Sequence, residues 1–154
     1  MPTTAVDLAA YLTSAQVSIL ADSPAKSVLL DRLIVLMASS GVITDLAAFR
    51  KAIFDREEIT STAIGGGIAV PHARLDSIRD FALVLAIIPQ GTDLGARDGL
   101  PVRVAVMIAS PEDERHRHLQ VLAAVAARLG NPERCESLVS AKDISSAMRA
   151  FLSW

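Results

Sequence analysis

Residues Ile64–Ala73 read Ile-Gly-Gly-Gly-Ile-Ala-Val-Pro-His-Ala, and the interpretation of the whole chain starts from this stretch. Three consecutive glycines let the backbone turn sharply and bring bare N–H groups close to a ligand, as an anion-binding loop requires. Ile68–Val70 are predicted to form a short buried strand, and Pro71 then fixes the backbone so that His72 is held at its end. Since the unperturbed pKa of histidine is about 6.5, a neutral imidazole nitrogen is available near pH 7 and can accept a phosphoryl group. The alternative is a structural histidine that hydrogen-bonds a loop beside a glycine turn.

Length and composition predict one globular domain over residues 1–154. A chain of this length can bury roughly 68 to 70% of the surface that its unfolded form exposes, so the core needs no disulfide or structural metal. The formal net charge of -2 provides no electrostatic footprint for nucleic acid, which is not expected as a partner. The longest apolar runs, near 81–89 and 102–109, are far shorter than the roughly 20 residues of a transmembrane helix.

Cysteine usage favours a reducing compartment. Cys135 is the only cysteine, which excludes an intrachain disulfide and any metal site built from several cysteines. The N-terminus shows no signal-peptide pattern, so we expect a cytoplasmic protein. No cofactor is expected, and the chain shows no internal repeat or low-complexity segment.

Two helices are predicted before the glycine stretch. The first begins at Ser23-Pro24, with serine as N-cap and proline at the first helical position, and runs until Gly41. The second begins at Asp45 and ends in the charged residues 55–58, which places Arg56 just before the glycines. Its predicted buried side chains are Leu46, Phe49, Ile53 and Phe54.

Two apolar runs after His72 are predicted to be strands. Phe81–Ile88 is almost continuously apolar, as strands covered on both faces are, and Pro89-Gln90-Gly91 is expected to end it. Val102–Ile108 is a second run, rich in β-branched residues, and it follows a turn signal at Asp98-Gly99. Near the N-terminus, Val17–Leu20 is a candidate edge strand.

The C-terminal third is predicted to be helical. Ser110-Pro111 starts a long helix that Gly130 closes, Asn131-Pro132 starts a short one, and Asp143 caps the last. The predicted buried side chains are Leu119, Leu122, Ala123, Ala126 and Leu129, then Ile144, Met148, Phe151 and Leu152, with Trp154 packing at the terminus. Helices before, between and after buried strands indicate a layered α/β domain.

The segment around His72 resembles the active-site signature of the type-2 IIA components of the bacterial phosphoenolpyruvate-dependent sugar phosphotransferase system (PTS), which include mannitol, fructose and nitrogen-related members. Every signature position is satisfied, by Glu57, Ile64, Gly65, Ile68, Ala69, Val70, Pro71, His72 and Ala73. Further similar landmarks are Arg56-Glu57, Ser61-Thr62, Asp98-Gly99-x-Pro101-Val102 and His118-Leu119-x-x-Leu122. The chain departs mildly at Ala73, where members often have glycine, and at Gly66, where they often have asparagine.

The resemblance implies a fold and a set of site residues. The fold is a single-domain mixed β-sheet between helical layers (α/β/α), the PTS IIA type-2 fold. His72 is implied to carry phosphate on Nε2, with Nδ1 held by a local hydrogen bond, and His118 to approach the phosphorylated ring. Arg56 and the loop Gly65-Gly66-Gly67 are the candidates to steady the phosphoryl oxygens, although an intrahelical ion pair is the alternative for Arg56. Thr62 is implied to bond the phosphate or His72, or else to cap a loop.

A zinc site built on the other histidines is not expected. His116 and His118 are two residues apart on a predicted helix, where successive side chains differ by about 100°, so they do not converge on one ion. His116 is therefore predicted to face solvent.

The resemblance implies a phosphotransferase component, an enzyme in the sense of a protein-histidine phosphoryl carrier. Its expected partners are the phosphocarrier HPr or a paralogue as donor, and a IIB component or a regulated target protein as acceptor. We expect a nitrogen-related regulatory role over sugar transport, because one IIA domain fills the 154 residues without a linker or a membrane-spanning segment. In the transport alternative, contact with a membrane permease is at most peripheral. A structural domain that has lost phosphorylation is a third possibility, against which the intact signature argues.

Overall fold

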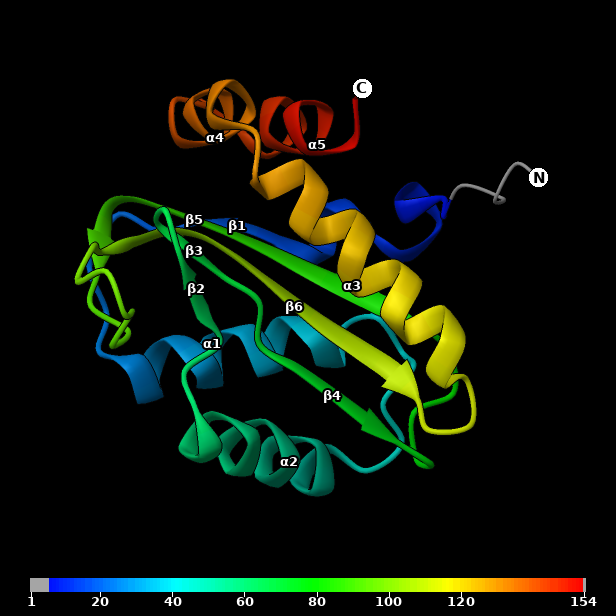
Figure 1. Cartoon of the computed structure of the whole chain (residues 1–154). Coiled ribbons are helices and arrows are strands. Elements are labelled where there is room, and N and C mark those ends of the chain that lie inside the picture. The colour runs from blue at the N-terminus through cyan, green and yellow to red at the C-terminus, as the bar shows by residue number, and fades with distance from the viewer. Residues whose placement is uncertain (1–5, 154) are drawn as a thin grey trace.

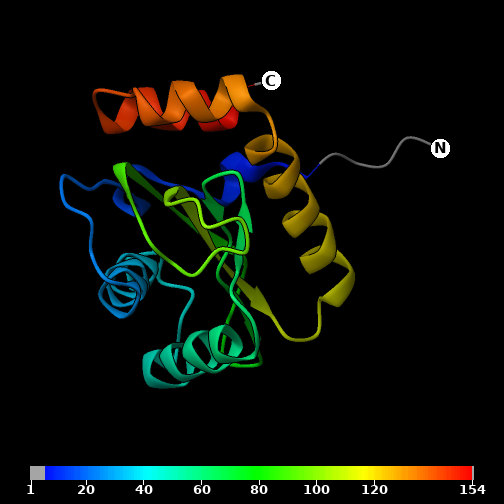
Figure 2. The same ribbon diagram turned by 60° about the vertical axis from the view of Figure 1, so that its left-hand side comes forward.

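A mixed six-stranded β-sheet lies between two layers of helices in the computed structural model, which describes residues 6–153 (Figure 1). The strands are β1 (Val17–Ile19), β2 (Ala63–Gly65), β3 (Ile68–Ala69), β4 (His72–Leu75), β5 (Ala82–Thr92) and β6 (Val102–Pro111). The helices are α1 (Lys26–Ala38), α2 (Leu46–Ile59), α3 (Arg115–Leu129), α4 (Pro132–Val139) and α5 (Ile144–Leu152), preceded by two short 3-10 helices, η1 (Leu8–Tyr11) and η2 (Ser14–Gln16). Figure 2 shows α1 and α2 on one side of the sheet, with α3, α4 and α5 on the other. The predicted α/β/α fold is confirmed. Trp154, which was predicted to pack at the terminus, lies outside the described residues.

The sheet order places His72 beside one long central strand. The order is β1-β5-β6-β3-β2, and β4 also pairs with β6. β5 and β6 run antiparallel, while β3 and β4 follow one another along the other edge of β6, parallel to it. Ile68 lies opposite Val104, and His72 lies opposite Ile108. His72 is therefore anchored in the sheet.

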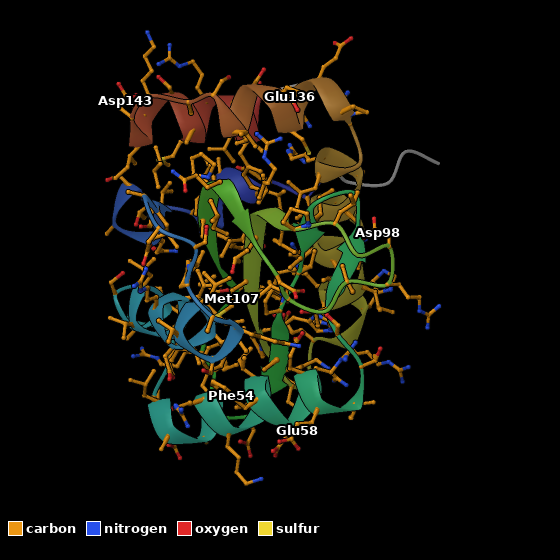
Figure 3. The ribbon with its side chains drawn as sticks, turned by 90° about the vertical axis from the view of Figure 1, so that its left-hand side faces the viewer. Phe54, Glu58, Asp98, Met107, Glu136 and Asp143 are labelled. Atoms are coloured by element: carbon orange, nitrogen blue, oxygen red, sulfur yellow. The ribbon has the colours of Figure 1, made fainter. Side chains whose placement is uncertain are left out.

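The core consists of two apolar clusters, one on each face of the sheet. Side chains of a strand point alternately to the two faces, so β5 contributes to both clusters. Val84 and Ala86 pack with α1 and α2, whereas Leu83 and Leu85 pack with α3, α4 and α5. Met107 of β6 belongs to the first cluster and lies in the interior in Figure 3. A strand buried on both faces explains why the run beginning at Phe81 shows no alternation of apolar and polar residues.

Several predicted helix boundaries are confirmed. Asp45, Asn131 and Asp143 are N-caps, and each side chain accepts a hydrogen bond from a backbone N–H of the first turn. Phe49 and Ile53 of α2 are buried as predicted. These helices start where local capping chemistry and the apolar pattern agree.

The predicted start of α1 is wrong. The helix begins at Lys26, and its N-cap residue, Ala25, makes no side-chain cap bond. The carbonyl of Pro24 instead accepts a hydrogen bond from the Thr92 hydroxyl at the end of β5. This tertiary hydrogen bond ties the segment before α1 to β5, and the N-cap predicted at Ser23 is not formed.

The predicted start of α3 at Ser110-Pro111 is also wrong. Both residues belong to β6, where they lie opposite Arg74 and Leu75 of β4. The helix begins four residues later, at Arg115. β4 itself was missed, because the chain after His72 is polar and the sequence does not show that β6 offers it a parallel edge.

β5 continues through the predicted break at Pro89-Gln90-Gly91 and ends at Thr92. The register with β6 shifts between Ile87 and Thr92, and Gly91 has a φ of 75°. A β-bulge therefore carries the strand past the proline and glycine.

Several side chains predicted to be buried are exposed. The buried residues of α3 are His118, Val121, Val125, Arg128 and Leu129. Of the predicted set only Leu129 is fully buried, and Leu119 is 53% exposed. The predicted face is rotated because a sequence interpretation does not count histidine and arginine as core residues. Leu46 and Ile144 are also exposed, since each is the first residue of its helix.

Candidate functional site

His72 is held by its own backbone in one orientation. It is the first residue of β4, directly after Pro71, and its side chain is half-buried. Its Nδ1 lies 2.8 Å from the carbonyl oxygen of Val70. A carbonyl only accepts, so Nδ1 carries the proton and donates it, which leaves a lone pair on Nε2. The local hydrogen bond that the resemblance implied for Nδ1 is present.

His118 faces His72 from the first turns of α3. The two ring centroids are 5.5 Å apart and the ring planes are inclined by 50°. His118 is buried, and its Nδ1 lies 2.7 Å from the hydroxyl oxygen of Ser110 in β6. Burial, followed by the electrostatic influence of His72 and Arg74, lowers the pKa of His118 below its ordinary value. The implied approach of the two histidines is confirmed.

Three arginines surround the cavity at the two histidines. The cavity has a volume of about 370 Å³ and is lined by Ala52, Arg56, His72, Ala73, Arg74, Arg115, His118 and Leu119. None of the salt bridges found within residues 6–153 involves Arg56, Arg74 or Arg115. No carboxylate is among the lining residues, so the charged side chains at this cavity are all basic, as binding of an anion would require.

Backbone carbonyls hold two of these arginines. Arg56, near the end of α2, donates to the carbonyl of Thr60 at 3.1 Å. Arg74, in β4, donates to the carbonyl of Glu112 in the segment that leads into α3. A neutral carbonyl fixes the direction of a guanidinium without cancelling its charge, so both side chains keep donors available for an anion.

Glu57, the first residue of the signature, holds the segment between α2 and β2 in place. Its carboxylate accepts hydrogen bonds from the backbone N–H of Thr62 at 2.9 Å and from the Thr62 hydroxyl at 2.7 Å, and Lys26 of α1 lies 3.0 Å away. Burial raises the pKa of Glu57, but the Thr62 hydrogen bonds and Lys26 outweigh it, so the pKa lies below its ordinary value. The Thr62 hydroxyl is engaged inside a buried cluster, in the manner of a loop cap.

The glycine loop lies away from the histidines. Gly65 ends β2, and Gly66 and Gly67 form the turn to β3. All three have φ between 68° and 95°, a region that favours glycine. The carbonyl of Gly67 accepts a hydrogen bond from the N–H of Arg103 on β6, whereas His72 lies opposite Ile108 of the same strand. Arg103 and Ile108 are five residues apart, which corresponds to about 16 Å along the strand.

The N–H of Gly66 already has a partner. It donates to the carboxylate of Asp98 at 2.9 Å, and this bond, followed by that from the N–H of Leu100, lowers the pKa of Asp98. Asp98 lies in the loop before β6 (Figure 3). The three glycines thus shape the hairpin between β2 and β3, and Asp98 accepts a hydrogen bond from it. None of the three lines the cavity at His72.

Comparison with known proteins decides the family. The sequence model for "Phosphoenolpyruvate-dependent sugar phosphotransferase system, EIIA 2" matches residues 10–154. The chain belongs to this family.

Relatives of this PTS IIA protein include a mannitol-specific phosphotransferase enzyme IIA component from Staphylococcus aureus, 34% identical over 118 residues, which are 75% of this chain and 76% of that protein. A PTS system fructose-specific EIIABC component from Bacillus subtilis is 30% identical over 131 residues, which are 85% of this chain. The match spans only 21% of the Bacillus subtilis protein.

Solved structures share the fold of this IIA protein. The nitrogen regulatory protein IIA-Ntr from Neisseria meningitidis superposes with a TM-score of 0.82 at 23% identity, covering 92% of this chain and 95% of that one. Enzyme IIA mannitol from Escherichia coli, solved in complex with phosphorylated enzyme IIB mannitol, gives a TM-score of 0.78 at 22% identity, covering 91% and 96%. At these identities the similarity is one of fold.

Sequence reasoning missed three residues that lie beside the two histidines. Arg74 lies two residues after His72 in an extended segment, a spacing that puts both side chains on one face of a strand. Arg115 precedes His118 by one helical turn, a spacing that puts them on one face of α3. Both signals could be read from the sequence once β4 and the start of α3 are known. Ser110 has no such signal, because only the packing of α3 on β6 brings it to His118.

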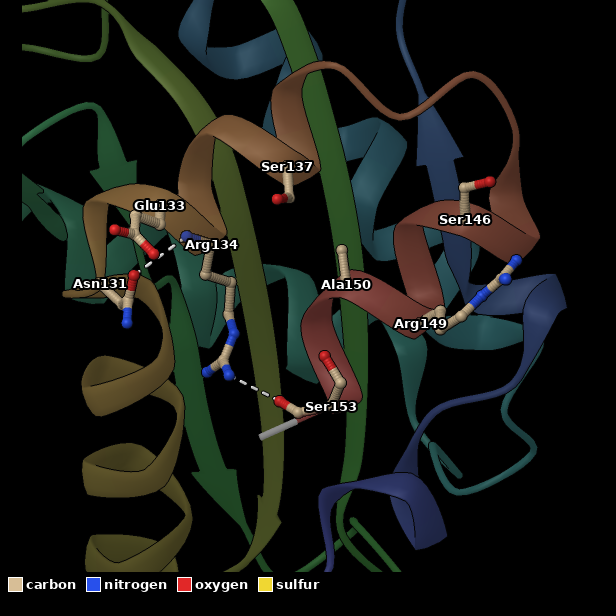
Figure 4. Close-up of a pocket in the computed structure, with 8 residues that line it drawn as sticks. All are labelled: Asn131, Glu133, Arg134, Ser137, Ser146, Arg149, Ala150 and Ser153. Carbon is tan, nitrogen blue, oxygen red and sulfur yellow. Dashed lines mark hydrogen bonds between the residues drawn. The ribbon is translucent and has the colours of Figure 1, made fainter.

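A second hollow lies between α4 and α5 (Figure 4). Its lining includes Arg134, which donates to the carbonyl of Ser153 at 2.6 Å, and Arg149, which extends away from Arg134. Glu133 also lines it, so positive and negative charges are mixed there, in contrast to the cavity at His72.

Residues 6–153 contain neither a cluster of metal ligands nor a helix that could span a membrane. No three side chains of histidine, cysteine, aspartate or glutamate gather there in a way that could hold a metal ion. His116 is exposed, as predicted. None of the described helices is both long enough and apolar enough to cross a bilayer.

Proposed function

We propose that this protein is a phosphohistidine carrier that accepts a phosphoryl group on Nε2 of His72 from an HPr-type phosphocarrier. The observation that supports this most is the hydrogen bond between Nδ1 of His72 and the Val70 carbonyl, which leaves the Nε2 lone pair free beside three arginines. A histidine with a fixed tautomer and a cationic surround is suited to nucleophilic attack on a phosphoryl group.

In the transfer, the bond between phosphorus and the donor's histidine nitrogen breaks as a bond forms between phosphorus and Nε2 of His72. The proton on Nδ1 stays in its hydrogen bond to the Val70 carbonyl, where it stabilises the positive charge that the ring gains. The donor's phosphohistidine carries a proton on its other ring nitrogen, so its ring loses the positive charge that the His72 ring gains and leaves as a neutral imidazole. Atoms and charge then balance between the two rings.

The protein's contribution is positioning and neutralisation of charge on the transferring group, which phosphoryl transfer mainly requires. Arg56, Arg74 and Arg115 approach the cavity from α2, β4 and α3, so guanidinium groups can surround the phosphoryl oxygens. Arg74 and Arg115 are exposed, and their attraction for phosphate is therefore screened by water. Moderate attraction suits a carrier, which must release the group it holds.

Phosphate labelling tests this function. We expect the wild-type protein to be phosphorylated when incubated with phosphoenolpyruvate, enzyme I and HPr, and the product to be labile in acid and stable in base. His72→Ala should abolish labelling, whereas the matched variant His116→Ala, which removes an exposed histidine near the site, should be labelled at the wild-type rate. Undiminished labelling of His72→Ala would show that another residue carries the phosphate.

We propose a regulatory end use for the phosphorylated protein, in which the state of His72 alters its binding to a target protein. The landmarks from Arg56 to His118 that resemble nitrogen-related members support this role. Phosphorylation would add nearly two negative charges at a half-buried histidine, enough to change which partner fits that surface.

Transfer to a IIB component is the alternative acceptor step, and the 34% identity to a mannitol-specific IIA component favours it. The two roles are separable by experiment. Binding of a target that changes with the phosphorylation state, lost in His72→Ala, supports regulation. Rapid transfer of the label to a sugar-specific IIB protein, with loss of growth on one sugar when the gene is deleted, would instead establish transport.

A further inference from the structure

We propose that Ser110 is a positioning residue that fixes His118 in the tautomer with its proton on Nε2, so that His118 presents a hydrogen-bond donor to the phosphoryl group. This role depends on the proposed phosphorylation of His72, but the tautomer itself can be observed without phosphate.

The contact between Ser110 and His118 is short and buried. Ser110 is fully buried near the end of β6, and its hydroxyl oxygen lies 2.7 Å from Nδ1 of His118. The strand pairing opposite Arg74 fixes the backbone at Ser110, and α3 places His118 above it. A hydroxyl held at this distance in a buried site is a strong determinant of which ring nitrogen is protonated.

The direction of this hydrogen bond follows from the proton of the hydroxyl group. Within residues 6–153, His118 is the only hydrogen-bond partner of the Ser110 hydroxyl. If Nδ1 carried the proton, the hydroxyl would accept it and its own O–H would be buried without an acceptor, which is costly. If the hydroxyl donates to Nδ1, both groups are satisfied. Nδ1 is then the acceptor, and the ring proton of a neutral His118 must lie on Nε2.

The two histidines consequently have opposite tautomers. His72 is protonated on Nδ1 by its bond to the Val70 carbonyl, and His118 is protonated on Nε2 by its bond to Ser110. One ring therefore offers a lone pair to the cavity, and the other offers an N–H. An Nε2 lone pair on His118 would repel phosphoryl oxygens, whereas an Nε2–H would bond them. The lowered pKa of His118 supports this assignment, since the neutral ring is the form in which a tautomer must be chosen.

Nitrogen-15 NMR of the unphosphorylated protein, with labelled histidines, reads the tautomer directly. We expect wild-type His118 to be protonated on Nε2 and His72 on Nδ1. In Ser110→Ala, His118 should lose its single tautomer while His72 and His116 keep their wild-type signals, and Ser110→Thr, which keeps a hydroxyl, should retain the Nε2–H form. Nδ1 protonation of wild-type His118, or an unchanged His118 in Ser110→Ala, would overturn the assignment.

Transfer kinetics then show whether the tautomer serves the reaction. Ser110→Ala should slow phosphorylation by HPr about tenfold, as expected for loss of one well-placed hydrogen bond. In a His118→Gln background, whose side-chain amide supplies its own donor, the same substitution should change the rate by less than about twofold. Equal slowing in both backgrounds would mean that Ser110 acts through the fold alone, and thermal unfolding of the variants checks this.

The two proposals fail in different ways. Absence of labelling in the wild-type protein would refute the carrier function, while the NMR measurement would still decide the tautomer of His118. Normal labelling of His72 with an unaltered rate in Ser110→Ala would refute the role of Ser110 and leave the carrier function in place.

Discussion

The two ends of β6 both gather polar groups, but they use them differently. At the end near Arg103, the N–H of Gly66 donates a hydrogen bond to the carboxylate of Asp98. At the end near Ile108, His72 leaves Nε2 without a protein partner among the residues described, and the surrounding arginines have no carboxylate beside them. The glycine end therefore pairs the Gly66 N–H with a carboxylate of the same chain, whereas the arginines of the histidine end have no such counter-charge. We therefore propose the phosphate site at the histidine end and not at the glycine loop.

The largest expected difference is in the phosphorylation rate when one arginine is removed from the histidine end or from the glycine end of β6. Arg56→Ala should slow phosphorylation by about 10- to 150-fold, because a charge-assisted hydrogen bond contributes about 1.5 to 3 kcal/mol. Arg103→Ala removes the same charge at the glycine end, beside Glu136, and should leave the rate near wild type. Initial rates of labelling by phosphorylated HPr measure both. Equal rates for the two variants would remove the distinction between the ends.

Opening the glycine end should affect the fold without affecting transfer. Asp98→Ala removes the acceptor of the Gly66 N–H, so the melting temperature should fall slightly. The labelling rate should stay within about twofold of wild type, because His72 lies about 16 Å away along the strand. Calorimetry and labelling of the same preparation provide the two readings. A large loss of labelling with an unchanged melting temperature would show that the glycine loop contributes to phosphate binding.

The smallest effect concerns the pH dependence of stability at the histidine end. The pKa of His118 is lower in the folded protein than in the unfolded chain, so the unfolded chain binds more protons as the pH falls below about 6.5. The stability contributed by neutral His118 is complete above that pH and is lost as the pH falls toward its folded pKa. His118→Gln should flatten this part of the curve of unfolding free energy against pH, whereas His116→Gln should not. An identical slope in both variants would place the titration elsewhere.

The sequence predicted the layers of the fold and the principal pair of histidines, because both depend on local signals. Asp45 and Asn131 cap helices through their own side chains, and the apolar run after Phe81 indicates a strand covered on both faces. The signature and the landmark at His118 led to two residues whose rings meet.

What the sequence could not predict depends on pairings between distant segments. β4 exists because β6 offers it an edge, and that pairing also draws Ser110 into a strand, away from the helix start that its proline suggested. The contacts of Arg74 and Ser110 with the site follow from this pairing. The sequence predicts a phosphate-binding role for the glycine loop because glycines permit close approach, but it does not show that Asp98, 32 residues later in the chain, accepts the hydrogen bond of the Gly66 N–H.

The most direct measurement is the location of the phosphate in the phosphorylated protein by nitrogen-15 and phosphorus-31 NMR with labelled histidines. We predict that the coupled nitrogen is Nε2 of His72, with Nδ1 still protonated and bonded to the Val70 carbonyl. Phosphate on Nδ1 of His72, on His118 or on any other residue would contradict the proposed assignment of the carrier nitrogen.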